Sequence, residues 1–217
     1  MATMNRVALK ICGVSTPDAI DAAVRGGASH VGFVHFPKSP RHLSPERLGL
    51  IAQRVPPQVK RVAVVVDVDD STIDGLAAAG GIRVFQLHGR ETPARVAQIK
   101  ARTGLEVWKV ISVKGAADLS GGAAYAGAAD FLLYDAKTPE GAALPGGMGH
   151  RFDWTLLAGH EAPMSWGLSG GLDASNVAEA ARITGATLVD VSSGVESVPG
   201  LKDIQKIAQF CRTVAAL

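Results

Sequence analysis

The feature that most constrains the fold of this 217-residue chain is a repeated alternation of short apolar runs with alanine-rich segments. The apolar runs are rich in β-branched residues and stay apolar along most of their length, which is typical of strands covered on both faces. They fall at residues 7–12, 30–36, 61–67, 84–88, 107–112, 130–135, 164–169 and 188–192. Several intervening segments begin with a helix-capping residue, as in "TPDAIDAAV" and "SPERLGLIA". The alternation therefore predicts eight βα units with parallel strands.

Eight such units in a chain of this length predict a single-domain (β/α)₈ barrel, the TIM-barrel architecture, over residues 1–217. The alternative is an open doubly wound sheet, which commonly carries G-x-G-x-x-G after its first strand, where this chain has "CGVSTPD". We expect a short or irregular fifth helix, because "KGAADLSGGAAYAGA" contains Gly121 and Gly122. The glycine- and proline-rich stretch 136–151 predicts a long mobile loop.

Composition restricts the class of protein and its partners. Hydrophobic residues make up 47% of the chain and charged residues 19%, as in globular proteins with an apolar core. A formal net charge of +2, with scattered Lys and Arg, argues against nucleic acid as the main partner. No signal peptide and no apolar run of about 18 residues is present, so we expect a cytoplasmic protein without a membrane partner. Cys12 and Cys211 are too few for a disulfide framework or a zinc cluster, and we expect no metal.

Chemically competent side chains gather at the carboxyl ends of the predicted strands, where the active sites of such barrels lie. They are Cys12, His35, Asp67, His88, Asp135, Ser169 and Ser192. Cys12 could be a small buried hydrophobe, but Lys10 points to the same side of the strand, and an ammonium favours the thiolate. Asp135 could be a turn cap, but burial at the mouth of an apolar barrel would keep its carboxyl able to give a proton. His35 and His88 lack the paired spacing of metal ligands, so hydrogen-bonding roles in a pocket are favoured.

Two glycine-rich loops follow the last two predicted strands, "LSGGLDASN" at residues 168–176 and "VSSGVES" at residues 191–197. Either could be an ordinary turn, but together they occupy the usual phosphate-binding place of the barrel. Backbone N–H groups of Gly170, Gly171 and Gly194 could converge on an anion, with hydroxyl groups from Ser192 and Ser193. The loops therefore predict a small phosphorylated substrate.

The loop "FPKSPRHLSPERL" after the second strand carries Lys38 and Arg41 between prolines. It could be a solvated loop with two surface charges. The prolines would stiffen it, however, and a fixed guanidinium at the barrel mouth is suited to bind a carboxylate bidentately. The inferred substrate then carries a phosphate at one end and a carboxylate at the other.

These motifs together resemble those of the phosphoribosylanthranilate isomerase family of tryptophan biosynthesis. The matching stretches, in family order, are "KICGVST", "GFVHFPKSPRHLSPE", "FQLHG", "LLYDAK", "FDW", "LSGGLDASNV" and "VDVSSGVES" with "PGLKD". The resemblance implies a cofactor-free Amadori rearrangement of N-(5′-phosphoribosyl)anthranilate to 1-(2-carboxyphenylamino)-1-deoxyribulose 5-phosphate. The sequence departs from the family pattern at Met148, where a small polar residue is usual, and at His35, where an aromatic residue is usual.

The same resemblance assigns roles residue by residue. Cys12 corresponds to the general base and Asp135 to the general acid, while Arg41 faces the anthranilate carboxylate. The remaining substrate-binding positions implied by the motifs are Gln86, His88, Gly170, Gly171, Asp190, Ser192, Ser193 and Gly194. No cofactor, no metal and no obligatory protein partner is implied.

Three other functions remain open on the sequence alone. A histidine-pathway isomerase performs the same type of rearrangement, but it has a phosphate loop after the third strand, where this chain has "VVVDVDDST" without glycine. Indole-glycerol-phosphate synthase relies on catalytic lysines and a glutamate that this sequence does not place. A phosphate-ligand sensor on a barrel scaffold would need neither an acid nor a base.

Overall fold

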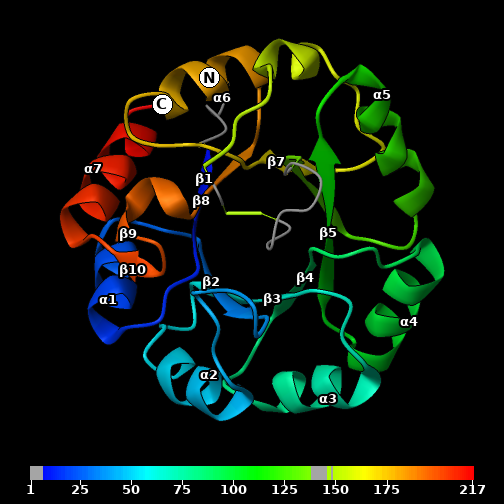
Figure 1. Ribbon diagram of the computed structural model, residues 1–217, viewed down its shortest axis with the longest axis vertical. Helices are drawn as coiled ribbons and strands as arrows, with labels where there is room; N and C mark the ends of the chain where they lie inside the picture. The colour runs from blue at the N-terminus through cyan, green and yellow to red at the C-terminus, as the bar shows by residue number, and fades with distance from the viewer. Residues whose placement is uncertain (1–6, 138–145, 148) are drawn as a thin grey trace.

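Eight parallel strands close into a barrel in the computed structural model, which describes residues 7–137, 146–147 and 149–217 (Figure 1). The strands are β1 (Ala8–Cys12), β2 (His30–His35), β3 (Lys60–Val65), β4 (Val84–Leu87), β5 (Glu106–Val113), β6 (Phe131–Ala136), β7 (Trp166–Leu168) and β8 (Leu188–Val191). Each strand pairs with the next, and β1 pairs with β8 from Ala8↔Leu188 to Ile11↔Val191. This last pairing confirms the predicted (β/α)₈ barrel and excludes the open sheet, whose outer strands would remain unpaired.

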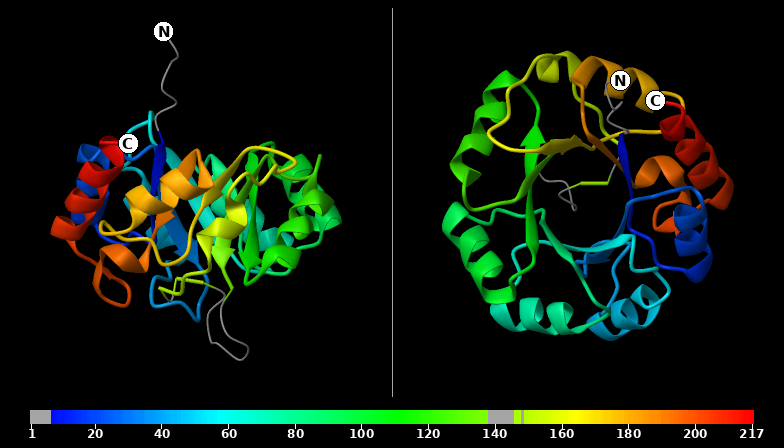
Figure 2. Two further views of the ribbon diagram at one scale, coloured as in Figure 1. Left: turned by 90° about the horizontal axis from the view of Figure 1, so that it is seen from above. Right: turned by 180° about the vertical axis from the view of Figure 1, so that it is seen from behind.

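Helices surround the barrel, and three of them begin in the same way (Figures 1 and 2). The helices are α1 (Pro17–Arg25), α2 (Pro45–Ala52), α3 (Asp70–Ala78), α4 (Pro93–Thr103), α5 (Ala116–Leu119), α6 (Val177–Thr184) and α7 (Ile204–Ala215). Before α1, α2 and α4, the side chains of Thr16, Ser44 and Thr92 accept a hydrogen bond from a backbone N–H of the first turn, and proline follows. Proline is favoured there because its missing N–H would lack a helical partner in any case.

The fifth βα unit is irregular, as the sequence predicts. Helix α5 has only 4 residues and continues into a 3₁₀ helix, η1 (Ser120–Tyr125). A Cβ atom at Gly122 would lie 2.8 Å from a methyl group of Leu132 and 3.1 Å from the hydroxyl of Tyr134. The glycine therefore allows η1 to approach β6, at the cost of regular helix.

Alternation along the strands divides the apolar interior into two layers. Ile11 of β1 belongs to the larger layer, which lies between the strands and the helices. Cys12 belongs to the smaller layer inside the barrel, with Val64, Val110 and Leu133. Because side chains alternate along a strand, Lys10 also points inward, and it is fully buried. The interior of this barrel thus carries charge close to its chemically active end.

A buried ion pair holds the loops that follow β3 and β4. Lys109 Nζ of β5 lies 2.9 Å from Glu91 Oε2 and donates to the carbonyl of Gly89 at 2.7 Å. Glu91 Oε1 accepts from the backbone N–H of Asp67 at 2.9 Å, and both carboxylate oxygens accept from Gly89 N. Both charged side chains are almost fully buried. Their pairing fixes the backbone on either side of His88.

Lys109→Met is therefore expected to destabilise the protein by about 3–5 kcal/mol, because it leaves the carboxylate of Glu91 buried without its cation. Lys60→Met is the matched control, since Lys60 pairs with Glu106 at the half-exposed surface, where an ion pair contributes about 1 kcal/mol or less. Urea unfolding of both variants measures the two free energies of unfolding. Equal losses in the two variants would contradict a structural role for the buried pair.

Part of the predicted loop 136–151 lies outside the described residues, as does Met148. Between β6 and β7 the described part of the chain contains one short 3₁₀ helix, η2 (Trp154–Leu157). None of the helices in the described part of the chain is long and apolar enough to cross a membrane.

Candidate active site

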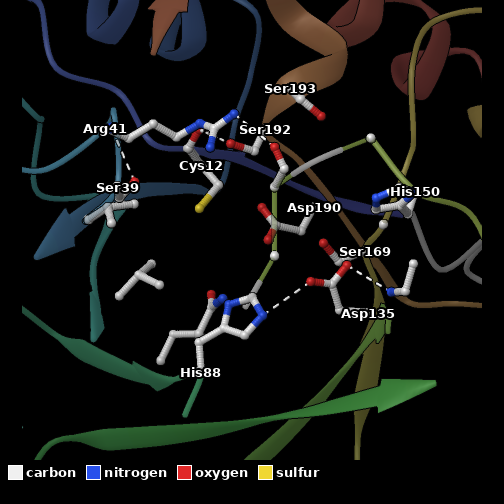
Figure 3. A pocket seen from close by; sticks show the side chains of 18 of the residues that line it. Cys12, Ser39, Arg41, His88, Asp135, His150, Ser169, Asp190, Ser192 and Ser193 are labelled. Carbon is white, nitrogen blue, oxygen red and sulfur yellow. Dashed lines mark hydrogen bonds and ion pairs between the residues drawn. The ribbon is translucent and has the colours of Figure 1, made fainter. Parts of the chain in front are cut away.

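An open pocket of about 790 Å³ lies at the carboxyl ends of the barrel strands (Figure 3). The predicted site residues that line it are Cys12, Arg41, Gln86, His88, Asp135, Ser169, Gly170, Gly171, Asp190, Ser192 and Ser193. They come from six strands or the loops that follow them. The fold thus brings together residues that are up to 181 positions apart in the sequence.

Three residues of the predicted set lie elsewhere. Gly194 packs behind the pocket, where a Cβ atom would lie 1.9 Å from the carbonyl oxygen of Leu172. His35 places its Nδ1 2.9 Å from the carbonyl oxygen of Leu43. Asp67 is exposed and accepts a hydrogen bond from the backbone N–H of Arg90. His35 and Asp67 therefore hold loops and do not line the pocket.

Cys12, Lys10 and Asp190 form a buried acid–base group on β1 and β8. Lys10 Nζ donates to both oxygens of Asp190, each at 2.9 Å. Burial raises the pKa of the Cys12 thiol, and the ammonium of Lys10 only partly offsets this rise. Burial also raises the pKa of Asp190, although Lys10 opposes that shift. Lys10 thus lowers the pKa of Cys12, as the sequence indicates, but the net direction is upward because desolvation of the thiolate is the larger effect.

Lys10 itself stays a strong cation. Burial alone would lower the pKa of Lys10, but the carboxylate of Asp190 and the neighbouring Cys12 outweigh that effect and raise it. One ammonium thus faces two acids, and the carboxylate holds it in a symmetrical contact. This arrangement stabilises a thiolate at Cys12 relative to the same burial without the cation.

In Figure 3 the Asp190 side chain lies between Cys12 and Asp135. Asp135 is 4% exposed, and its Oδ1 accepts a hydrogen bond from Ala136 N at 2.9 Å. His88 Nε2 lies 3.2 Å from Asp135 Oδ2, an ion-pair distance when the imidazole is protonated. Cβ atoms at Gly146 or Gly170 would lie 2.8 Å from one or the other of its oxygens. These two glycines let the backbone enclose the carboxyl group.

Arg41 is buried beside Cys12, while the neighbouring Lys38 is exposed. Its Nε and Nη2 both donate to the carboxylate of Glu196, each at 2.7 Å, and Nη2 also donates to the carbonyl of Gly147 at 2.9 Å. One bidentate edge of the guanidinium is therefore occupied by the chain itself. The sequence predicts that Arg41 binds a substrate carboxylate bidentately. In the structure Nη1 is the guanidinium nitrogen without a hydrogen bond to the described residues.

The glycine-rich loops after β7 and β8 meet at one end of the pocket. Gly170 and Gly171 have φ values of 91° and 62°, which favour glycine. The carbonyl of Gly171 accepts from Asn176 Nδ2 at 3.0 Å, directly before α6. The hydroxyl-bearing residues Ser192 and Ser193 line the same pocket from the β8 loop. The loops thus surround one end of the pocket with groups that can donate hydrogen bonds to an anion.

Four residues in or next to the pocket were not among the predicted site residues. Ser39 and His150 line it, and Glu196 and Lys202 lie directly behind Arg41 and Ser192. Glu196 is part of the quoted motif "VSSGVES", so the sequence shows its position but not its pairing with Arg41. A buried partner for Arg41 could have been suspected because a buried guanidinium is rarely left unpaired.

A closed (β/α)₈ barrel with a thiol, a carboxyl group and glycine-rich loops in one pocket defines a TIM-barrel enzyme equipped for proton transfer. Residues 9–213 match the sequence family described as N-(5′-phosphoribosyl)anthranilate (PRA) isomerase. The chain belongs to this family.

Individual relatives agree with the family match. The N-(5′-phosphoribosyl)anthranilate isomerase of Zymomonas mobilis subsp. pomaceae is 52% identical over 213 residues, which cover 97% of this chain and 99% of that protein. The crystal structure of phosphoribosyl anthranilate isomerase from Thermotoga maritima superimposes with a TM-score of 0.87 at 36% identity, covering 97% of this chain and 100% of that one. A further isomerase structure, in complex with reduced 1-(o-carboxyphenylamino)-1-deoxyribulose 5-phosphate, has a TM-score of 0.85 at 33% identity over 97% of this chain and 100% of that one. The chain is therefore an isomerase of tryptophan biosynthesis, and the sensor alternative is excluded.

Proposed function

We propose that this chain converts N-(5′-phosphoribosyl)anthranilate to 1-(2-carboxyphenylamino)-1-deoxyribulose 5-phosphate with Cys12 as general base and Asp135 as general acid. The observation that carries the proposal is the presence of a thiol and a carboxyl group in one pocket of a chain that belongs to the isomerase family. We further propose that residues 1–217 act as one cytoplasmic domain without a cofactor, a metal or an obligatory protein partner.

The first step opens the ribose ring. The Asp135 carboxyl group gives its proton to the ring oxygen while the bond from that oxygen to C1′ breaks. The lone pair of the anthranilate nitrogen forms a double bond to C1′, which leaves a protonated imine. Asp135 lines the pocket that would hold the ribose, and this position supports its role as the acid.

The second step removes the hydrogen at C2′. The imine acidifies this hydrogen, and the Cys12 thiolate takes it as a proton, so that an enolamine forms. The Asp135 carboxylate then takes up the proton lost by the C2′ hydroxyl, and the Cys12 thiol gives up the proton gained at C1′, which yields the aminoketose and restores both groups. The buried ammonium of Lys10 supports the thiolate during this cycle.

The pocket offers donors for both anionic groups of the substrate. The phosphate would bind at the loops of Gly170, Gly171, Ser192 and Ser193, and the anthranilate carboxylate would contact Arg41 Nη1. The neighbouring structure with a bound deoxyribulose 5-phosphate derivative supports a substrate of this chemistry. Gln86 Oε1 is buried at the pocket wall without a hydrogen-bond partner among the described residues, so it is available to accept a bond from a ribose hydroxyl.

Lys10→Met is expected to move the rising limb of the pH–kcat profile to higher pH. The ammonium of Lys10 lowers the pKa of Cys12, so its removal leaves burial unopposed and raises that pKa further. Because activity needs the thiolate, less of the enzyme is active at a given pH below the thiol pKa. An unshifted rising limb would leave Lys10 as a residue that only holds Asp190. Lys60→Met, a surface change, is the control.

Inorganic phosphate is expected to inhibit competitively by binding between the loops after β7 and β8. Ser193→Ala should weaken this inhibition by about tenfold or less, the range for one lost hydrogen bond. Ser197→Ala, an exposed serine of the same segment, should leave it unchanged. Phosphate that binds elsewhere in a crystal and inhibits non-competitively would contradict this assignment.

The reaction itself is tested by identifying the product. The purified protein is mixed with freshly prepared N-(5′-phosphoribosyl)anthranilate, and the mixture is separated by chromatography against authentic aminoketose. We expect the aminoketose to accumulate. If only anthranilate from spontaneous breakdown appears, the proposed function is wrong.

A further inference from the structure

Arg41, Glu196 and Lys202 form a buried ion triad behind the pocket. Glu196 lies in the strand β9 (Glu196–Val198) and Lys202 in the strand β10 (Leu201–Lys202), which pair after β8. Glu196 Oε1 accepts from Arg41 Nε at 2.7 Å and from Lys202 Nζ at 2.6 Å. Its Oε2 accepts from Arg41 Nη2 at 2.7 Å and from Gly200 N at 3.2 Å. All four bonds converge on one carboxylate, whose residue is 6% exposed.

The charges of the triad are unequal. Arg41 contributes a guanidinium and Glu196 a carboxylate. Lys202 adds an ammonium paired with Glu196, although burial lowers the pKa of Lys202. Burial would raise the pKa of Glu196, but its contacts with Arg41 and Lys202 outweigh this and lower it, so the carboxylate is ionised. Of the three, only Arg41 lines the pocket. The buried triad therefore carries an excess of one positive charge, and Arg41 is the side chain that presents this charge to a ligand. An anionic ligand would balance it.

The carboxylate of Glu196 also fixes the orientation of the Arg41 guanidinium. With Nε and Nη2 held, Nη1 is directed toward Gly147, where a Cβ atom would lie 2.8 Å from it. The alkyl part of Arg41 crosses Gly13, where a Cβ atom would lie 2.5 Å from Cδ. The guanidinium is thus held from both ends, close to Cys12 (Figure 3).

Lys202, the third member, connects the triad to the loop that follows β8. Lys202 Nζ donates to the carbonyl oxygen of Ser192 at 2.9 Å and lies 3.3 Å from its hydroxyl. The Ser192 hydroxyl in turn donates to the carbonyl of Cys12 at 3.3 Å. One carboxylate therefore connects Arg41 with the β8 loop and with the strand that carries the base.

We propose that Glu196 is a positioning residue that confers specificity for a carboxylate-bearing substrate by fixing the direction of Arg41. This inference rests on the proposed function, since it concerns the anthranilate end of that substrate. Preorganisation of this kind increases affinity only for a ligand that uses the fixed donor. The effect should therefore appear as a change in discrimination and not as a general loss of binding.

The test compares two ligands by calorimetry. One is reduced 1-(o-carboxyphenylamino)-1-deoxyribulose 5-phosphate, and the other is the same compound without its ring carboxyl group. The unaltered protein should prefer the carboxylate by about tenfold or more, the loss expected for one charge-assisted hydrogen bond. Glu196→Gln should reduce this preference to about threefold or less, because an amide cannot hold both guanidinium nitrogens. Inorganic phosphate should bind Glu196→Gln at least as tightly, because the triad then carries two uncompensated positive charges.

Three variants separate positioning from simple structural damage. Glu196→Asp keeps the charge but withdraws the oxygens by one methylene, so it should also reduce the preference while leaving phosphate affinity unchanged. Lys202→Met keeps the Arg41–Glu196 contact and should retain the preference. Glu106→Gln makes the same change at a surface ion pair and should behave as the unaltered protein.

A preference that is unchanged in both Glu196 variants would overturn the inference, as would an equal loss of affinity for both ligands. Failure of the unaltered protein to isomerise N-(5′-phosphoribosyl)anthranilate would contradict the proposed function instead. The two failures are distinguishable because one is measured by binding and the other by product formation.

Discussion

Replacing Cys12 with alanine is expected to lower kcat by about 10²–10⁴-fold, the contribution that a positioned general base normally makes. Alanine leaves no group that can take the C2′ hydrogen, yet it removes only one sulfur atom from the pocket wall. The affinity for a reduced product analogue should therefore stay within about threefold of that of the unaltered protein, because no hydrogen bond to the ligand is lost. Steady-state kinetics and calorimetry measure the two quantities separately.

The chain supplies its own control for this substitution. Cys211 of α7 is also buried, with its pKa raised to about 11 by desolvation, and it packs against Gly26 away from the pocket. Cys211→Ala should keep near-normal kcat. Cys12→Ser should be as poor as Cys12→Ala, since an unassisted hydroxyl is too weak an acid to supply a base near neutral pH. Near-normal kcat in Cys12→Ala would contradict the proposed mechanism.

Asp135→Asn is expected to lower kcat by a similar factor of about 10²–10⁴. An amide has nearly the same shape as the carboxyl group and can still accept the hydrogen bond from Ala136 N, but it cannot give the ring oxygen a proton. The loss should therefore fall on kcat and leave the affinity for the product analogue nearly unchanged.

Asp130→Asn is the matched control, because Asp130 precedes the same strand at its opposite end. There it accepts hydrogen bonds from Val107 N and Lys100 Nζ. Its replacement should leave kcat unchanged. If Asp135→Asn retains kcat within about tenfold, a factor smaller than general acids usually contribute, another group must open the ring, and His88 is the nearest candidate.

The fold was predictable because its signals are local. The period of apolar runs, the Thr-Pro and Ser-Pro starts of α1, α2 and α4, and the glycines of the fifth unit all act within a few residues. Strand ends differ from the prediction by one or two residues, and β7 is reduced to Trp166–Leu168. Such ends depend on pairing between strands, which a single run of sequence does not specify.

The acid and the base were predictable for a different reason, since barrel strands bring their carboxyl ends together whatever their order in the chain. The partner of Arg41 was not, because Glu196 lies 155 positions away and pairs with it only through the fold. The net pKa direction of Cys12 was also beyond the sequence. It depends on whether burial or the ammonium of Lys10 has the larger effect, and the sequence shows the cation but not the depth of burial.

The fluorescence of N-(5′-phosphoribosyl)anthranilate provides the most direct test of the central claim, that this barrel isomerises that compound with Cys12 as its base. Equal concentrations of the unaltered protein, Cys12→Ala and Cys211→Ala are mixed with fresh substrate, and the loss of fluorescence is followed. We expect rapid loss with the unaltered protein and with Cys211→Ala, and loss about 10²–10⁴-fold slower with Cys12→Ala. Loss at the spontaneous rate with the unaltered protein, or equally fast loss with Cys12→Ala, would contradict the claim.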